Sequence, residues 1–366
     1  MAYFLLNKYT HCLCCLFLLA SFLPCQDLFA LENSAGATIL IYHKFGEDKY
    51  PTTNVALDRF EEQMQFLQDN SYQVIALSDL VDNLKGQGGG ALPEKTVVIT
   101  IDDGYMSTYT AAWPILKKYG YPFTVFLYVK AVESKYRNFL TWAQIREMQA
   151  AGVDFQPHTY SHHRLGSWDP SLDEIGYRNW ISMDLQKGSA VLKELFGIQS
   201  RYIALPYGEY NTIIIDEAQK LGFKAILTQD PGSISSSTDL FRIPREPILG
   251  TDWATIKHLK QVLERTDLPL ADMYPGFEPF VKTTPDQFCA SVQDVAKYQK
   301  GSFGVYVSEL GWQPATVAAN RACIDNKKTL IRRTNRVAFS ARLKDSGGTA
   351  IHYWLLLNPY ASAPAD

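Results

Sequence analysis

From about residue 38 onward, short apolar runs rich in β-branched residues alternate with longer segments whose apolar residues recur at helical spacing. This alternation is typical of parallel β-α units. We expect buried strands at residues 38–43, 95–101, 123–129, 153–157, 201–205 and 223–228. Helices are expected at residues 141–151, 173–196 and 211–221, and one more helix would carry Leu57, Phe60, Met64 and Leu67 on one face. The number of units favours a barrel.

The alternation ends near residue 270, after a helix that begins around Asp252. Farther along, the pattern changes to strands, which we expect at residues 303–310, 336–343 and 350–357. The turn-like sequence DSGG joins the last two as a hairpin. We therefore expect one domain over residues 31–270 and a small β-rich C-terminal domain over residues 271–366.

The first 30 residues have the organisation of a signal peptide. An apolar run of about a dozen residues, CLCCLFLLASFL, follows Lys8 and precedes the cleavage-like triplet Leu28-Phe29-Ala30. A helix that spans a bilayer needs about 20 apolar residues, so a retained anchor is less favoured. We therefore predict an exported protein, periplasmic or extracellular, that contacts a membrane only if the leader is not cleaved.

Four of the six cysteines lie in this leader, which leaves Cys289 and Cys323. In an exported protein these two are expected to form a disulfide bond that closes a loop of about 34 residues. Two free buried cysteines are the alternative. A metal site at these cysteines is disfavoured because the sequence has no C-x-x-C spacing there.

The composition excludes two further classes. With 46% hydrophobic and 20% charged residues among 366, the chain can form at least one full core, so it is neither disordered nor collagen-like. Its 35 basic and 38 acidic residues give a net charge of −3, so nucleic acid is not an expected partner.

Two adjacent carboxylates, Asp102 and Asp103, follow the strand expected at residues 95–101. In parallel α/β folds, functional sites are built at the carboxyl ends of strands. Neighbouring residues leave a strand in opposite directions, so one aspartate could bind a metal while the other acts on a water molecule. A turn with helix-capping aspartates is the alternative interpretation.

Three histidines follow the strand expected at residues 153–157, in the sequence HTYSHH. His158 and His162 are four residues apart, a spacing that would place both imidazoles on one face of a helical turn. With a carboxylate they would form a metal site that leaves positions open for water and substrate. His163 could instead be the true second ligand, an outer residue or an exposed bystander.

The segment LPYG at residues 205–208 follows another expected strand and could point a backbone N–H into a cleft, although by itself it is an ordinary turn. Taken in order, ITIDDG, HTYSH and LPYG resemble the motifs of the polysaccharide deacetylase family, carbohydrate esterase family 4. The resemblance implies a distorted (β/α) barrel, a divalent metal that is usually zinc, and hydrolysis of acetyl groups on polysaccharides. It implies a general base at Asp102, an oxyanion donor in the Tyr207 backbone, a substrate contact at Pro206, and metal ligands at Asp103, His158 and His162.

One position departs from the family's third motif, which begins with an arginine that orients the base. This chain has Ala204 there, and either Arg201 or Arg245 could take its place. The segment Ile243-Pro244-Arg245 resembles a narrower branch of the family and favours Arg245, which we also expect near the substrate.

The general acid is not assigned. The family often supplies it from a late Leu-x-His motif, which residues 256–258 match only in part. We expect His258 on the solvated side of a helix, and His43, at the end of the first strand, is a further candidate for a role in the cleft.

The narrower branch includes deacetylases of extracellular poly-N-acetylglucosamine. We therefore expect an enzyme that removes acetyl groups from N-acetylglucosamine units of an exported polysaccharide. The alternatives are a carbohydrate-binding protein with little or no catalysis and an esterase that removes O-acetyl groups from another glycan. In the second domain, Trp312, Tyr353 and Trp354 could stack on sugar rings, although aromatic residues in strands more often pack in the core.

Overall fold

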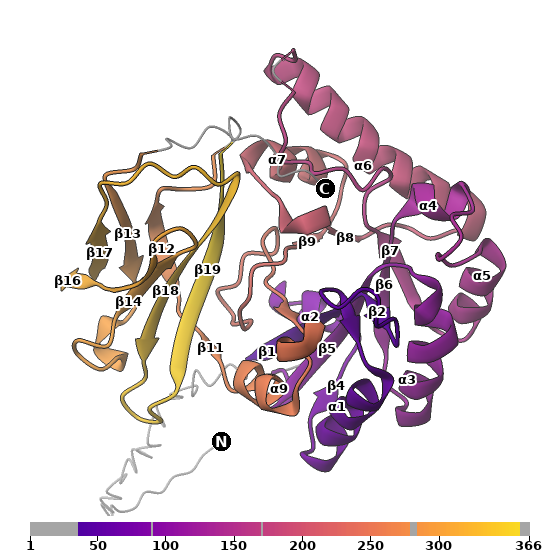
Figure 1. The fold of residues 1–366 in the computed structure, drawn as a ribbon, viewed down its shortest axis with the longest axis horizontal. Helices are drawn as coiled ribbons and strands as arrows, with labels where there is room; N and C mark the ends of the chain where they lie inside the picture. Colours follow the sequence, from indigo (N-terminus) through magenta and orange to yellow (C-terminus); the bar gives the residue numbers. More distant parts are fainter. Residues whose placement is uncertain (1–35, 89–90, 170, 279–283, 359–366) are drawn as a thin grey trace, which may run out of the picture. The chain divides into compact units, whose positions relative to one another are not determined.

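Figure 1 shows the computed structural model, which describes residues 36–88, 91–169, 171–278 and 284–358. The expected signal peptide lies outside the described residues. Everything described belongs to one compact unit. Within it, no helix combines the length and the apolar character needed to cross a lipid bilayer.

A parallel sheet organises the N-terminal part of the described chain. Its strands are ordered β10-β1-β5-β6-β7, and β4 pairs with the beginning of β5. Every residue of β1, β5 and β6 is buried, as expected for parallel strands that are covered on both faces. The strands are β1 (Ala37–Tyr42), β4 (Gln73–Val74), β5 (Thr96–Asp103), β6 (Phe123–Leu127), β7 (Asp154–Pro157) and β10 (Glu246–Pro247). A short parallel pair, β2 (Lys44–Phe45) and β3 (Asn54–Val55), follows β1.

The backbone ladder does not close into a complete barrel among the described strands. Strands β8 (Tyr202–Ala204) and β9 (Ala225–Leu227) pair with each other outside the larger sheet. Between β7 and β8, the side chain of Gln156 takes the place of main-chain pairing, because its Oε1 accepts hydrogen bonds from the N–H groups of Arg201 and Tyr202 at 3.0 and 3.2 Å. The expected α/β class is thus confirmed, with a glutamine side chain bridging one gap in the ladder.

The helices pack apolar faces against these strands. In α1, Phe60, Met64 and Leu67 are buried at the spacing that the sequence predicts, whereas Leu57, the first residue of the helix, is 42% exposed. Three short helices, α2, α3 and α4, have no counterpart among the expected elements, and each buries at most three residues. The helices are α1 (Leu57–Asp69), α2 (Leu77–Leu84), α3 (Trp113–Tyr119), α4 (Val129–Glu133), α5 (Trp142–Ala150), α6 (Glu174–Phe196), α7 (Thr212–Lys220), α8 (Gly250–Trp253) and α9 (Ile256–Leu263).

Two sheets make up the β-rich C-terminal region (Figure 1, orange to yellow), and their described strands pair antiparallel except β11, which is parallel to β19. One has the order β11-β19-β18-β14-β15 and the other β12-β13-β17-β16, and their buried side chains form a common core that includes Phe288, Val305, Val337 and Trp354. This region begins at Thr266, a few residues before the expected boundary. The strands are β11 (Thr266–Asp267), β12 (Leu270–Tyr274), β13 (Gln287–Val292), β14 (Gly304–Val307), β15 (Gly311–Pro314), β16 (Thr316–Ala318), β17 (Arg321–Asp325), β18 (Thr334–Arg342) and β19 (Thr349–Leu357).

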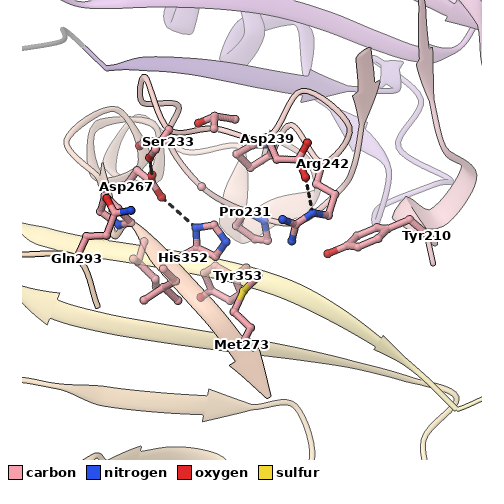
Figure 2. A pocket seen from close by; sticks show the side chains of 17 residues that line it. Tyr210, Pro231, Ser233, Asp239, Arg242, Asp267, Met273, Gln293, His352 and Tyr353 are labelled. Atoms are coloured by element: carbon pink, nitrogen blue, oxygen red, sulfur yellow. Dashed lines mark hydrogen bonds and ion pairs between the residues drawn. The ribbon is translucent and has the colours of Figure 1, made fainter. Parts of the chain in front are cut away.

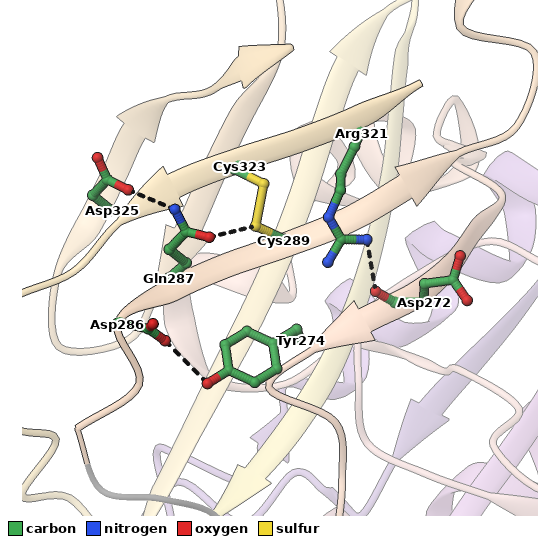
Figure 3. The surroundings of a disulfide bond; sticks show 8 residues. All are labelled: Asp272, Tyr274, Asp286, Gln287, Cys289, Arg321, Cys323 and Asp325. Atoms are coloured by element: carbon green, nitrogen blue, oxygen red, sulfur yellow. Dashed lines mark hydrogen bonds between the residues drawn. A yellow bond between two sulfur atoms is a disulfide. The ribbon is translucent and has the colours of Figure 1, made fainter. Parts of the chain in front are cut away.

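The expected disulfide bond between Cys289 and Cys323 is present (Figure 3). The two cysteines are direct partners on the neighbouring antiparallel strands β13 and β17. The bond closes a loop of 34 residues and fastens two strands of one sheet. The hairpin expected near the end of the chain is formed by β18 and β19.

Candidate active site

The candidate site begins at the carboxyl end of β5, whose last two residues are Asp102 and Asp103. Their side chains diverge, as the pleat of a strand requires, so that Asp102 contacts Arg245 while Asp103 lies beside two histidines. The strand then turns sharply, with φ of 70° at Asp103 and 75° at Gly104. A Cβ at position 104 would lie 2.6 Å from Leu127 Cδ2, so the turn requires glycine.

His158 and His162 reach the site from an irregular loop after β7, so the expected helical turn is wrong. Thr159 and His162 have φ of 61° and 55°, which are left-handed conformations that an α-helix does not contain. Thr159 Oγ1 instead accepts a hydrogen bond from the His162 N–H at 3.0 Å. The two imidazoles therefore converge because of a specific turn, and their spacing in the sequence does not by itself bring them together.

Helix α6 supports this loop from behind. The Asp184 carboxylate accepts hydrogen bonds from the N–H groups of Tyr160 and Ser161 at 3.2 and 3.0 Å. Gly188, one turn farther along α6, lets the helix approach closely, because a Cβ there would lie 3.2 Å from the main chain of Thr159 and Tyr160. The helix thus fixes the position of both histidines through the loop backbone.

Asp103, His158 and His162 bring three metal-binding groups together, with one ligand atom of each within 4.8 Å of the other two. Asp103 Oδ1 lies 3.5 Å from His158 Nε2 and 3.0 Å from His162 Nε2. That oxygen is buried, and in the described part of the chain it accepts no hydrogen bond. A buried carboxylate oxygen without a donor is costly, and a cation among the three groups would satisfy it. The residues fit a divalent metal with two nitrogen ligands and one oxygen ligand. His163 is exposed and lies outside this cluster.

The protonation of His158 suits such a ligand. Burial lowers the pKa of His158 to about 4, against the opposing influence of Asp102 and Asp103, so its imidazole is neutral near pH 7. Its Nδ1 lies 2.8 Å from the carbonyl oxygen of Ala204, which places the proton on Nδ1 and leaves Nε2 as the lone-pair nitrogen. Ala204, the position that departs from the family pattern, thus orients a histidine through its main chain.

Asp102 and Arg245 form a fully buried pair, with both side chains 0% exposed. Arg245 Nη1 and Nη2 donate to Asp102 Oδ1 and Oδ2 at 2.7 and 2.8 Å. Burial alone would raise the pKa of Asp102, but Arg245, supported by His158 and His43, offsets it and holds that pKa below its usual value. The carboxylate is therefore ionised at neutral pH.

The other candidate arginine is occupied elsewhere. Arg201 Nη2 donates to Asp82 Oδ1 at 2.9 Å near the surface. Arg245 takes further hydrogen-bond partners in the interior, where its Nε donates to the Thr228 carbonyl at 2.8 Å and its Nη1 to Thr100 Oγ1 at 3.2 Å. These bonds fix the guanidinium plane against Asp102.

Tyr207 lies beside the histidines in the short helix η2 (Pro206–Gly208). It has φ of 60° and ψ of 6°, and its ring is 5.1 Å from that of His162 between centroids. The Arg164 guanidinium lies 3.6 Å from the centre of the Tyr207 ring. Asp103, Thr159, His162 and Tyr207 are four of the ten non-glycine residues with positive φ in the described chain. Such backbone strain tends to concentrate at functional sites.

A cavity of about 780 Å³ is lined by Asp103, His158, His162 and Tyr207. Pro206 and Arg245 are buried and are not among the residues that line this cavity, so their contact with substrate stays a prediction. Asp102 is also buried, and its Oδ2 is 3.8 Å from His158 Nε2.

Two more histidines line the same cavity. His43 has a buried Nδ1 that makes no hydrogen bond within the described residues. The prediction that His258 faces solvent is wrong: the side chain is half-buried, stacks on Trp253 and places Nε2 3.3 Å from the Pro247 carbonyl oxygen. His258 of α9 lines the cavity, and helical periodicity cannot distinguish a position that faces a cavity from one that faces bulk solvent.

The β-rich region also contributes to the cavity, through Tyr306, Ser308, Trp312, Arg336 and Tyr353. Trp312 and Tyr353 were singled out in the sequence only by residue type. Their approach to the histidines depends on contacts between distant parts of the chain, which no local pattern reveals. Trp354, the third of the aromatic candidates, is a core residue with 0% exposure.

A neighbouring cavity of about 520 Å³ shares His162 and Tyr207 with the first one. Arg164, His163 and Trp180 are among its other lining residues. His162, one of the candidate metal ligands, therefore borders both cavities, as a site for an extended ligand would require.

A smaller cavity of about 120 Å³ lies between the parallel-sheet region and the β-rich region (Figure 2) and shares Pro231 and Tyr353, but no candidate metal ligand, with the larger cavity. Its ionic side chains are paired: Arg242 Nε donates to Asp239 at 2.9 Å, and His352 Nδ1 lies 3.1 Å from Asp267 Oδ1. The first pair lies within one segment and the second joins β11 to β19, and with both pairs formed we assign this cavity a structural role.

Comparisons with known proteins agree with this geometry. Residues 89–226 match the family described as polysaccharide deacetylase. The poly-β-1,6-N-acetyl-D-glucosamine N-deacetylase of Escherichia coli is 28% identical over 268 residues, covering 62% of this chain and 39% of that protein. The protein of the same name from Staphylococcus epidermidis is 28% identical over 204 residues, covering 55% of this chain and 70% of its own. The chain thus matches well under half of the Escherichia coli protein.

A solved structure shows the same fold. The Streptococcus pyogenes deacetylase PplD in complex with acetate superposes with a TM-score of 0.55 and 25% identity, covering 62% of this chain and 98% of that one. Sequence motifs, parallel sheet and site geometry agree with the match of residues 89–226 to the polysaccharide deacetylase family.

Proposed function

We propose that this protein hydrolyses the N-acetyl groups of N-acetylglucosamine units in a polysaccharide outside the cytoplasm, with a divalent metal that is most readily zinc. The observation that carries this proposal is the cluster of Asp103, His158 and His162, in which a buried carboxylate oxygen has no hydrogen-bond donor. The names of the Escherichia coli and Staphylococcus epidermidis relatives support the choice of substrate. The disulfide bond and the leader pattern support an exported protein.

Asp103 Oδ1, His158 Nε2 and His162 Nε2 would hold the metal. Such an ion supplies Lewis acidity toward an acetyl carbonyl and toward a water molecule at the same site. The neutral imidazole of His158 and its hydrogen bond to Ala204 favour binding through Nε2.

Asp102 is proposed as the base that accepts a proton from the attacking water. It is ionised at neutral pH, and its Oδ2 lies close to His158 Nε2. Arg245 is a positioning residue for this base, because its two hydrogen bonds fix the carboxylate plane. Water adds to the acetyl carbon, the carbon–nitrogen bond breaks, and acetate and a glucosamine amine are released.

Tyr207 is proposed to stabilise the charge that develops on the carbonyl oxygen through its backbone N–H. Its strained conformation places this residue beside His162 at the junction of the two cavities. The departing nitrogen must gain a proton, and His43 and His258 are the cavity histidines outside the metal cluster that could donate it.

The test of the proposed function is acetate release from N-acetylglucosamine oligomers by zinc-loaded protein. We expect release that a chelator abolishes and zinc restores, with an equal amount of new primary amine in the product. Release of acetate without new amine would indicate an O-acetyl esterase. A protein that binds zinc but releases no acetate from any oligomer would contradict the proposal.

The role of Asp102 has its own test. Asp102→Asn should bind zinc as tightly as the unaltered protein but lose at least about 100-fold in kcat, the usual contribution of a general base. If the Asp102→Asn variant is fully active, then Asp102 is not the general base.

A further inference from the structure

In the β-rich region, one face of the sheet with the order β11-β19-β18-β14-β15 carries a row of aromatic side chains. Trp312 on β15 is the direct partner of Tyr306 on β14, Tyr306 is the partner of Ala338 on β18, and Ala338 is the partner of Tyr353 on β19. Directly opposed residues of antiparallel strands project from the same face. The three aromatic side chains all line the cavity that contains the candidate metal ligands.

The opposite face of the same sheet is its core face. Val305, Val337 and Trp354 alternate with the members of the row along their strands and are 0% exposed. The aromatic row is therefore not part of the core of the β-rich region. Because side chains alternate along a strand, Trp354 lies on the core face of this sheet. Trp312, Tyr306 and Tyr353 lie on the other face, toward the parallel-sheet region.

Farther along β19, the same face is sealed against the deacetylase domain. Leu355 and Leu357 follow Tyr353 at two-residue spacing and are buried in a cluster with Ile203 and Leu205. The Leu355 N–H donates to the Tyr210 hydroxyl at 3.0 Å. One end of this sheet face is thus packed on the deacetylase domain, while the end with Tyr306 and Trp312 borders the cavity.

Polar contacts hold the row in place beside the active site. Arg336 on β18 donates from Nε to Asp230 Oδ1 at 3.3 Å and from Nη2 to the Gln229 carbonyl at 3.2 Å. Gln229 in turn packs on Gly208, the residue after Tyr207. The segment that positions the proposed oxyanion donor is therefore in contact with the β-rich sheet through one intervening residue.

Trp312 is unusually accessible for so large an apolar side chain, with 52% exposure. Its ring lies 5.4 Å from that of Tyr306 between centroids, so the two form a continuous aromatic surface. Trp253 of α8 is 51% exposed and lines the same cavity from the deacetylase domain. Exposed tryptophans from two separate parts of the fold therefore border one cavity.

The charges beside these rings are matched. Arg265 forms two hydrogen bonds of 2.7 Å with Glu246, and Arg336 pairs with Asp230. Because these cations are already paired, the cavity offers aromatic faces and neutral hydrogen-bonding groups to a ligand. This combination suits an uncharged pyranose ring, which has an apolar face and polar edges.

We propose that the β-rich C-terminal region is part of the substrate-binding site, and that Trp312 and Tyr306 stack on a sugar unit of the polysaccharide away from the unit being deacetylated. This inference rests on the proposed function for the identity of the sugar. It assigns the C-terminal sheet a role in selecting long substrates, because Trp312 and Tyr306 line the cavity from a different part of the fold than the candidate metal ligands.

The test compares Trp312→Ala, Trp312→Phe and Tyr306→Ala with a matched control, Tyr274→Ala. Tyr274, seen near the disulfide bond in Figure 3, is also an exposed aromatic residue of the β-rich region, at 39%, but it is not among the residues that line the cavity. Binding of N-acetylglucosamine dimers and hexamers is measured by isothermal titration calorimetry on metal-free full-length protein, and acetate release is measured on the zinc-loaded form. Thermal unfolding confirms that each variant is folded.

We expect Trp312→Ala to weaken hexamer binding by about five- to tenfold, the size of a lost aromatic contact, and to leave dimer binding within twofold. KM for the hexamer should rise by a similar factor while kcat stays unchanged. Trp312→Phe should retain most of the affinity, Tyr306→Ala should resemble Trp312→Ala, and Tyr274→Ala should have no effect.

The two proposals can fail separately. Equal hexamer affinity in Trp312→Ala and the unaltered protein, or no hexamer binding by the unaltered protein, would overturn the role of the C-terminal sheet. Hexamer binding that depends on Trp312, without acetate release, would support that role and contradict the deacetylase activity. Acetate release with the same KM in Trp312→Ala and the unaltered protein would support the deacetylase activity and contradict the role of the C-terminal sheet.

Discussion

Arg245 and Asp102 are 143 residues apart in the sequence, yet they meet through two parallel hydrogen bonds in a fully buried pair. The family motif that usually carries the arginine has Ala204 at that position, so this chain supplies the same kind of group from the segment before β10. A buried ion pair of this kind is costly to break from one side, because the remaining charge has no partner.

Removing the arginine alone should therefore be more harmful than removing both charges. We expect Arg245→Met to lower the free energy of unfolding by about 3–5 kcal/mol, since it leaves Asp102 buried and unpaired. The double variant Asp102→Asn with Arg245→Met should recover at least about 1 kcal/mol of this loss while remaining inactive. Denaturant unfolding curves provide the measurement.

A surface pair of the same chemistry serves as the control. Arg201 and Asp82 are 43% and 36% exposed in their side chains and lie 2.9 Å apart. Arg201→Met should cost less than about 1 kcal/mol, because exposed pairs are screened by solvent. Similar losses in Arg201→Met and Arg245→Met would show that burial of the Asp102 pair has no special effect.

The candidate metal ligands make a separate prediction. Asp103→Ala, His158→Ala and His162→Ala should each weaken zinc binding by more than about 100-fold, because even residues that only support a ligand contribute 10- to 100-fold. Equilibrium dialysis with metal analysis measures the change. Zinc at 100 times its Kd should also raise the stability of the unaltered protein by about 2.7 kcal/mol, an increase that the three variants should lack.

His163→Ala is the matched control for the histidines, since His163 is adjacent to His162 but exposed and outside the cluster. Its zinc affinity should equal that of the unaltered protein. A large loss of affinity in His163→Ala, with none in His162→Ala, would show that His163 binds the metal and that His162 does not.

The source of the proton for the departing amine is tested by two cavity histidines. His43 is among the groups that lower the pKa of both Asp102 and Asp103, so it lies within electrostatic reach of both. His258 Nε2 is instead close to the Pro247 carbonyl oxygen. We expect His43→Ala to reduce kcat by about 100-fold, in the range of an acid catalyst, and His258→Ala to reduce it by less than tenfold. The reverse order would assign proton donation to His258.

The sequence predicts the components of this site better than their arrangement. Asp102 and Asp103 could be placed at a strand end because an unbroken apolar run precedes them, and such a run marks a parallel strand buried on both faces. His158 and His162 could be identified by type and proximity, but the expected helical turn is wrong because Thr159 and His162 take left-handed conformations. Single-residue backbone strain of this kind has no periodic signal.

Long-range contacts account for the rest. The pairing of Arg245 with Asp102 could be anticipated only from the family resemblance, since nothing in the local sequence of either residue refers to the other. The position of Trp312 in the cavity wall depends on the register of β14 with β15 and on the packing of β19 against Ile203 and Leu205. Residue type alone cannot separate Trp312 from Trp354, which is fully buried on the opposite face of the same sheet.

The turn that carries Tyr207 depends on a glycine. Gly208 has φ of 68°, and a Cβ there would lie 2.6 Å from Gln229 Cβ and 2.7 Å from Gln229 N. Gly208→Ala should therefore lower the free energy of unfolding by about 2–4 kcal/mol, which combines the cost of a left-handed alanine with that of overpacking. The Gln229 carbonyl accepts a hydrogen bond from Arg336, which holds Gln229 in place. The added methyl group should therefore move the Tyr207 turn away from Gln229 and reduce kcat as well.

Gly222 separates the two contributions. Its φ of 87° is also left-handed, but no atom lies within 4 Å of the position that a Cβ would occupy. Gly222→Ala should lower the free energy of unfolding by about 1–2 kcal/mol, the cost of a left-handed alanine alone, and leave acetate release unchanged. If Gly208→Ala is no more harmful than Gly222→Ala in unfolding and in kcat, then close packing against Gln229 does not position Tyr207, and the oxyanion donor must be held by other contacts.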